Sequence, residues 1–115
     1  LPGPWSVGTP PADELPARTH QATAANAVPM DLLALDAQVT DCNAALFDVA
    51  HDFHGCIAGC HEVLRRQGLL EGIWCLDPEE GLGKGQAGEI DRVYRLHGDL
   101  ADDAFVKANL QRWLA

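Results

Sequence analysis

The sequence has few basic residues and no long apolar run. Only 8 of its 115 residues are Lys or Arg, against 17 Asp and Glu, so the formal net charge is −9. The basic residues are scattered, which disfavours nucleic-acid binding because phosphate neutralisation needs a basic face. No apolar run approaches the roughly 18 residues that span a bilayer, and no signal-peptide pattern is visible. We therefore expect neither a nucleic-acid nor a membrane partner.

Cysteine is also too scarce for a disulfide framework. Disulfide scaffolds contain roughly 8–10% cysteine, whereas this chain has only four cysteines in 115 residues. Two of them, Cys56 and Cys60, lie four apart in a helical pattern, where a bridge would be strained. We expect reduced thiols in a cytoplasmic protein. The four are Cys42, Cys56, Cys60 and Cys75.

Proline is concentrated at one end of the chain. Six of the seven prolines fall within residues 1–29, which show no sustained hydrophobic period. We expect an irregular leader there, with Trp5 as its large anchor, and a helical domain over residues 30–115. The chain starts at Leu1 and has one methionine, Met30, so we expect a processed chain or a fragment of a longer protein.

The helical domain is predicted from apolar positions spaced three and four apart. The first such series runs from Leu32 to Phe53 and predicts a helix of about five or six turns, with Asp31 as its N-cap. After a turn around His54 and Gly55, the second series runs from Ile57 to Leu64. It predicts a helix that ends at Gly68, with two arginines in its last turn. The first helix has the apolar stripe Leu32, Leu35, Val39, Cys42, Leu46, Val49 and Phe53.

Two further helices follow a connector that Gly and Pro interrupt. Residues 69–85 are too broken for regular structure and too apolar for a solvated loop, so we expect them to lie extended across a hydrophobic surface. The third helix is predicted over residues 86–96, burying Ile90, Val93 and Tyr94 and stopping at Gly98. The fourth begins near Asp102 or Asp103 and buries Phe105, Val106, Leu110, Trp113 and Leu114. The fold class is all-α, with about four helices.

Metal-ligand residue types gather in HDFHGCIAGCHE, residues 51–62. Cys56 and Cys60 share a helix face, and His51 and His54 precede them, so a zinc-type site is one interpretation. Structural zinc sites usually add a second, distant ligand pair, and none is visible here. We favour packing, in which Gly55 and Gly59 allow close approach, the thiols fill the junction and the histidines flank it. The metal alternative uses His54, Cys56, Cys60 and His51.

Other chemistries fit these residues poorly. The thiols of Cys56 and Cys60 are separated by three residues, whereas attached haem uses two. A nucleophilic Cys56 with His54 as base cannot be established from sequence adjacency. The glycines of residues 81–85 do not match a phosphate-binding loop, and the nearby carboxylates are expected to stabilise helix starts. We predict no catalytic residues and no cofactor.

Four segments follow one another as helix end, helix end, connector and helix start: residues 43–47, 64–70, 75–82 and 86–93. The first contains Asn43, the second reads LRRQGLL, the third reads CLDPEEGL, and the last begins an amphipathic helix. Together they resemble the C-terminal helical region of the dihydrodipicolinate synthase and N-acetylneuraminate lyase family of class I aldolases. In that family a (β/α)8 barrel is followed by extra helices.

The resemblance implies a role without independent catalysis. Family chemistry resembles Schiff-base formation on a barrel-strand lysine assisted by a tyrosine, whereas this chain offers only Lys84, Lys107 and Tyr94. The Pro-x-Lys pair that often enters the family's second helix is replaced by residues 56–58, Cys-Ile-Ala. The last helix also extends beyond the usual family end.

Three hypotheses follow. The first is a C-terminal helical segment of such a lyase, packing on the rest of the barrel and at a homo-oligomer interface, and not active alone. The second is a stand-alone helical metal-binding module. The third is a helical interaction domain without chemistry.

Overall fold

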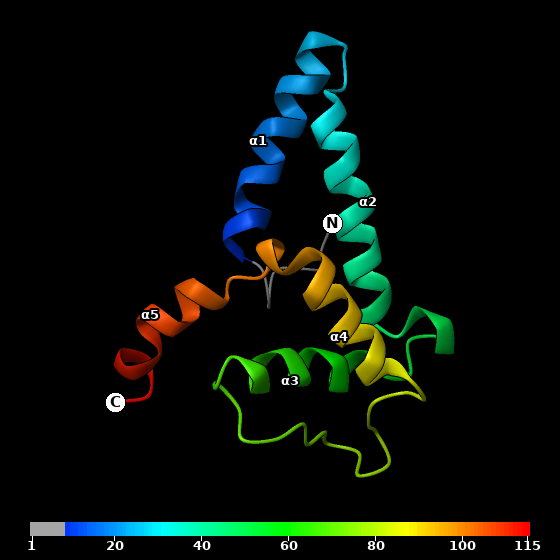
Figure 1. Cartoon of the computed structure of the whole chain (residues 1–115), viewed down its shortest axis with the longest axis vertical. Coiled ribbons are helices and arrows are strands. Elements are labelled where there is room, and N and C mark those ends of the chain that lie inside the picture. Colours follow the sequence, from blue (N-terminus) through cyan, green and yellow to red (C-terminus); the bar gives the residue numbers. More distant parts are fainter. Residues whose placement is uncertain (1–8) are drawn as a thin grey trace.

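The computed structural model describes residues 9–115, with side chains from residue 15 onward. All regular structure in this range is helical, which confirms the all-α class, and there is one α-helix more than expected (Figure 1). No helix in the range has the length and apolar character of a membrane span. The α-helices are α1 (Thr9–Ala25), α2 (Met30–Leu46), α3 (Cys56–Arg66), α4 (Gln86–His97) and α5 (Asp103–Trp113), with 3-10 turns η2 (Val49–His51) and η3 (Gly98–Leu100).

The additional helix, α1, corrects the expectation that residues 1–29 are irregular throughout. Two of its prolines, Pro10 and Pro11, fall in the first turn, where a missing N–H removes no intrahelical bond. Pro16 lies inside the helix and is tolerated there. Asn26, with φ 50°, ends α1 in a left-handed residue, and Ala27 N–H donates to the Ala22 carbonyl. Trp5, the expected anchor, lies outside the described residues.

Helix α2 follows α1 after the turn of residues 26–29, and the two helices diverge from that turn in a V-shaped arm (Figure 1). Its N-cap is Pro29 and not Asp31, which sits in the first turn and forms an ion pair with Arg18 of α1. It ends at Leu46, earlier than the predicted Phe53. The reason is Asp48, whose φ of 53° is left-handed and turns the chain out of the helix.

Helix α3 begins at Cys56, directly after the predicted turn, and ends at Arg66, next to the predicted end at Gly68. Gly68 follows with φ 81°; its N–H donates to the Arg65 carbonyl, and Leu69 N–H donates to the Leu64 carbonyl. This paired arrangement is a Schellman motif, which requires a residue without Cβ strain at the left-handed position. Gly68 therefore explains why the predicted end is correct.

The core lies where α2, α3 and α4 meet. Ile90 of α4 is fully buried, and it packs with Leu46 of α2 and Val63 of α3. Val93 is buried as predicted, and Tyr94 packs at the edge of the cluster. Ile90 is the only large side chain with less than 2% exposure in the described part of the chain, so the core is small.

Two predictions about burial are wrong. Residues 69–85 form no regular structure, as expected, but their Trp74 and Leu76 side chains point into solvent and do not cover an apolar surface. Helix α5 starts at Asp103 with Asp102 as N-cap, as predicted, yet only Val106 is buried. The helix extends away from α3 and α4 (Figure 1), which leaves three of its apolar side chains exposed: Phe105, Trp113 and Leu114.

Candidate functional site

A buried polar junction joins the end of α2 to the starts of α3 and α4. Its centre is Gln86, 2% exposed, whose Nε2 donates to the carbonyls of Ala45, Leu46 and Gly55 at 3.0–3.3 Å. Its Oε1 accepts a hydrogen bond from Gly83 N–H at 2.7 Å. The amide thus satisfies backbone groups from three parts of the chain, and this makes the junction structural.

Asp48 forms the second part of this junction. Its carboxylate is buried, accepts a hydrogen bond from Gly55 N–H at 3.1 Å, and lies 2.7 Å from Nδ1 of His51. A Cβ added at Gly55 or Gly83 would collide with the Asp48 carboxylate or the Gln86 amide. Gly55 therefore allows close packing here, as the sequence suggested, although the packed groups are polar.

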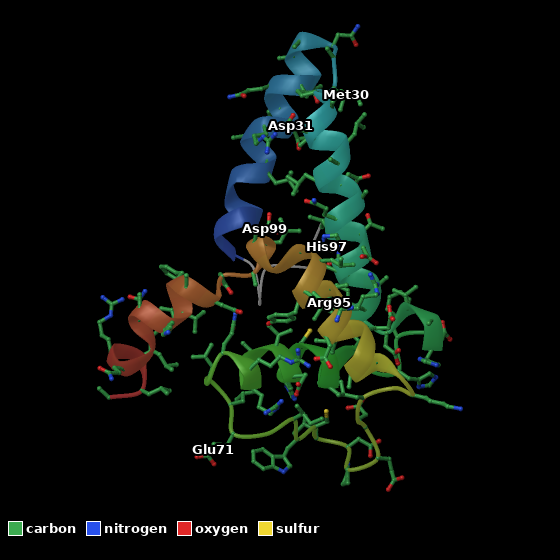
Figure 2. All side chains as sticks on the ribbon, in the orientation of Figure 1. Met30, Asp31, Glu71, Arg95, His97 and Asp99 are labelled. Atoms are coloured by element: carbon green, nitrogen blue, oxygen red, sulfur yellow. The ribbon has the colours of Figure 1, made fainter. Side chains whose placement is uncertain are left out.

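A charged cluster connects α2 to α4. Arg92 donates through both terminal nitrogens to the two oxygens of Asp41 at 2.7–2.8 Å. Nε2 of His97, which is labelled in Figure 2, lies 2.9 Å from the same carboxylate. The Arg92 hydrogen bonds, with help from His97, hold the pKa of Asp41 well below its usual range. A bidentate Arg–carboxylate pair fixes the relative orientation of the two helices.

A second charged cluster lies along α3. Glu62 is buried and accepts hydrogen bonds from Arg65 and Arg66 at 2.7–2.8 Å. The hydrogen bonds from Arg65, and then those from Arg66, lower the pKa of Glu62 to about 2 against the opposing effect of burial. Arg66 also pairs with Asp91 of α4 and covers the ring of Tyr94. The cluster therefore ties α3 to α4.

Acid is expected to weaken the fold through Glu62. Because its pKa falls from 4.5 to about 2 on folding, its stabilising contribution is complete above pH 4.5 and is lost as the pH drops toward 2. We expect this carboxylate to account for about 1–2 kcal/mol of the free energy of unfolding lost in that window. Urea titrations between pH 2 and 6 should show a smaller loss for Glu62→Gln.

A matched control is Glu71→Gln, which removes an exposed carboxylate from residues 69–85. The free energy of unfolding of this variant should fall with pH as that of the unsubstituted chain does. If Glu62→Gln showed the same pH dependence as the unsubstituted chain, the lowered pKa of Glu62 would make no contribution to the free energy of unfolding.

The described residues do not form a set of metal ligands. Within residues 15–115, no three His, Cys, Asp or Glu side chains converge as metal ligands would. His51 is directed to Asp48, His54 is exposed, and Cys56 and Cys60 are half-buried on α3. These four residues are neighbours in sequence, but the turns of residues 48–55 separate their side chains.

Neither the Cys42 and Cys75 thiols nor the Tyr94 hydroxyl is activated. Burial raises the pKa of the two thiols, which favours their protonated form. Cys75 Sγ lies 3.9 Å from His61 Nδ1. Burial raises the pKa of Tyr94 to about 12, and its hydroxyl is buried without a partner among the described side chains. Such a phenol is not poised as a base.

Exposed apolar side chains are the feature that distinguishes this surface. Phe105 (52% exposed) and Trp113 (43%) contact each other edge to face at a centroid distance of 5.7 Å, and Leu114 (61%) follows them. We call these three the α5 apolar face. Helix α5 is attached to the rest by Gln67, which donates to Asp102 and Asp103, by the buried Val106, and by Leu110, whose side chain lies beside Gly68. The sequence identified these apolar residues but assigned them to the core.

Comparison of this chain with protein-family models, with curated proteins and with solved structures gives no match.

Proposed function

We propose that this chain is a helical docking segment that packs on a larger folded body, as the C-terminal helices pack on the barrel in the dihydrodipicolinate synthase and N-acetylneuraminate lyase family. The observation that carries the proposal is the α5 apolar face, three large side chains on a helix that projects from a small core. Contiguous exposed apolar surface of this kind is typical of an interaction site. The occupant is the barrel of the same lyase.

The segment supports a Schiff-base lyase without performing its chemistry. Lys84 and Lys107 are exposed on a connector and on α5, and Tyr94 is half-buried on α4. None of the three lies on a strand in residues 9–115. The nucleophilic lysine would come from the barrel, and the reduced thiols fit a cytoplasmic setting.

Amide hydrogen exchange tests this docking. The reading frame extended upstream of Leu1 would be expressed, and exchange over residues 103–113 compared with that in this chain alone. We expect at least tenfold slower exchange in the longer protein, because covering α5 suppresses its local opening. Phe105→Asp with Trp113→Asp should abolish the difference.

Lys107→Glu, an exposed change on the same helix, is the control and should preserve the slower exchange. An upstream frame without alternating strands and helices, or equal exchange in both proteins, would contradict the proposal. Slower exchange only at high concentration of this chain would instead assign α5 to a homo-oligomer interface.

A further inference from the structure

A second exposed apolar feature lies in the connector between α3 and α4. We call residues 69–80 the acidic connector. Its Trp74 is 75% exposed and its Leu76 is fully exposed, although tryptophan and leucine are residues that folding normally buries. Neither Trp74 nor Leu76 belongs to the core cluster around Ile90 and Val63. Their exposure is independent of the α5 apolar face.

The alternation of the chain explains why these two side chains face solvent. Burial alternates along residues 73–76, from half-buried to exposed at every second residue. Cys75 points inward, where its Sγ lies 3.9 Å from His61 Nδ1 of α3, and Ile73 is half-buried beside it. Trp74 and Leu76 therefore point outward together, two residues apart on one side.

The Trp74 ring lies against Gly72 of its own segment. Three of its ring atoms lie so close to Gly72 that a Cβ there would be within 2.9 Å of them. At one end, the Schellman motif at Gly68 fixes the departure from α3. At the other, Gly83 N–H binds the Gln86 side chain. An anchored segment loses less conformational entropy on binding than a free one does.

The charged residues of the acidic connector itself are all acidic. There is no Lys, Arg or His between Arg66 and Lys84, and Figure 2 shows Glu71 at the outer side of the connector. None of the connector's carboxylates takes part in an ion pair within residues 15–115. The carboxylates are Glu71, Asp77, Glu79 and Glu80.

We propose that the acidic connector binds a protein partner through an apolar stripe bordered by Lys and Arg side chains. Trp74 and Leu76 would bury on the stripe, and the four carboxylates would face its basic border. A second copy of this chain is disfavoured as occupant, because each copy carries a net charge of −9 and the connectors would repel. The proposal does not depend on the docking of α5.

The test uses two synthetic 18-residue helical peptides without tryptophan. One has a leucine stripe flanked by lysines, and the other has glutamates in place of the lysines. Calorimetric titration of the full chain should show binding to the lysine peptide that weakens with salt, and none to the glutamate peptide. Trp74→Ala with Leu76→Ala should weaken binding at least tenfold, and Glu79→Gln with Glu80→Gln about threefold or more.

The matched control is Met30→Ala with Leu33→Ala, two exposed apolar side chains on α2. This variant should bind as the unsubstituted chain does. Failure of the unsubstituted chain to bind the lysine peptide, or binding that survives loss of Trp74 and Leu76, would overturn the proposal. If Phe105→Ala with Trp113→Ala weakened binding and Trp74→Ala with Leu76→Ala did not, the peptide would bind α5 instead. If the chain bound phosphatidylcholine vesicles through Trp74, the partner would be a lipid surface. Either result would overturn the proposal.

Discussion

Replacing Gln86 by Leu is expected to lower the free energy of unfolding by about 3–4 kcal/mol. Leucine keeps much of the volume but removes the amide that serves Gly83 N–H and the carbonyls of Ala45, Leu46 and Gly55. The three carbonyls belong to buried residues, and that of Gly55 keeps the hydrogen bond from Gly59 N–H. Each buried group left unsatisfied costs about 1–3 kcal/mol, partly offset by local relaxation.

Urea titration followed by circular dichroism at 222 nm would measure the change. Gln111→Leu, an exposed glutamine on α5, is the control and should alter stability by less than about 0.5 kcal/mol. A loss below about 1 kcal/mol for Gln86→Leu would show that the junction does not contribute to stability.

Gly59→Ala is expected to cost about 2–3 kcal/mol. A Cβ at this position would overlap the backbone carbonyl of Leu46 and approach the Gln86 side chain within 3 Å. The carbonyl belongs to the last residue of α2 and cannot rotate away as a flexible side chain can. The methyl group therefore forces α3 away from α2.

Gly88→Ala is the matched control, since a Cβ on this residue of α4 meets nothing within 4 Å. There the same substitution should stabilise the protein by about 0.5–1 kcal/mol, because alanine favours helix over glycine. Thermal unfolding of the two variants should thus shift in opposite directions. If both substitutions stabilised the protein, helix propensity alone would govern both positions, and the overlap at Gly59 would be refuted.

The predictions that succeeded rest on local chemistry. Helices α3 and α4 have their apolar positions at helical spacing, and Gly68 supplies the left-handed end that the first of them needs. Asp102 precedes α5 as predicted. In each of these cases, the determining groups lie within a few residues of one another in the sequence.

The predictions that failed depend on the surroundings of each element. The apolar series from Leu32 to Phe53 fits one helix, but Asp48 turns the chain because its carboxylate is held by Gly55 N–H and His51. The spacing that placed Phe105 and Trp113 in a core is correct for a helix face. Nothing in that spacing specifies whether the surface opposite belongs to this chain.

For HDFHGCIAGCHE, the sequence by itself determined a turn followed by a helix in which glycines permit close packing. The tertiary structure decided which group is packed there, and that group is the amide of Gln86. Gln86 lies more than 30 positions from Gly55 in the sequence and about 40 from Leu46. Local propensity acts over a few residues, whereas these hydrogen bonds form only after α2, α3 and α4 have assembled. The physical reason is that helix formation is encoded locally, while burial and polar satisfaction are properties of the assembled helices.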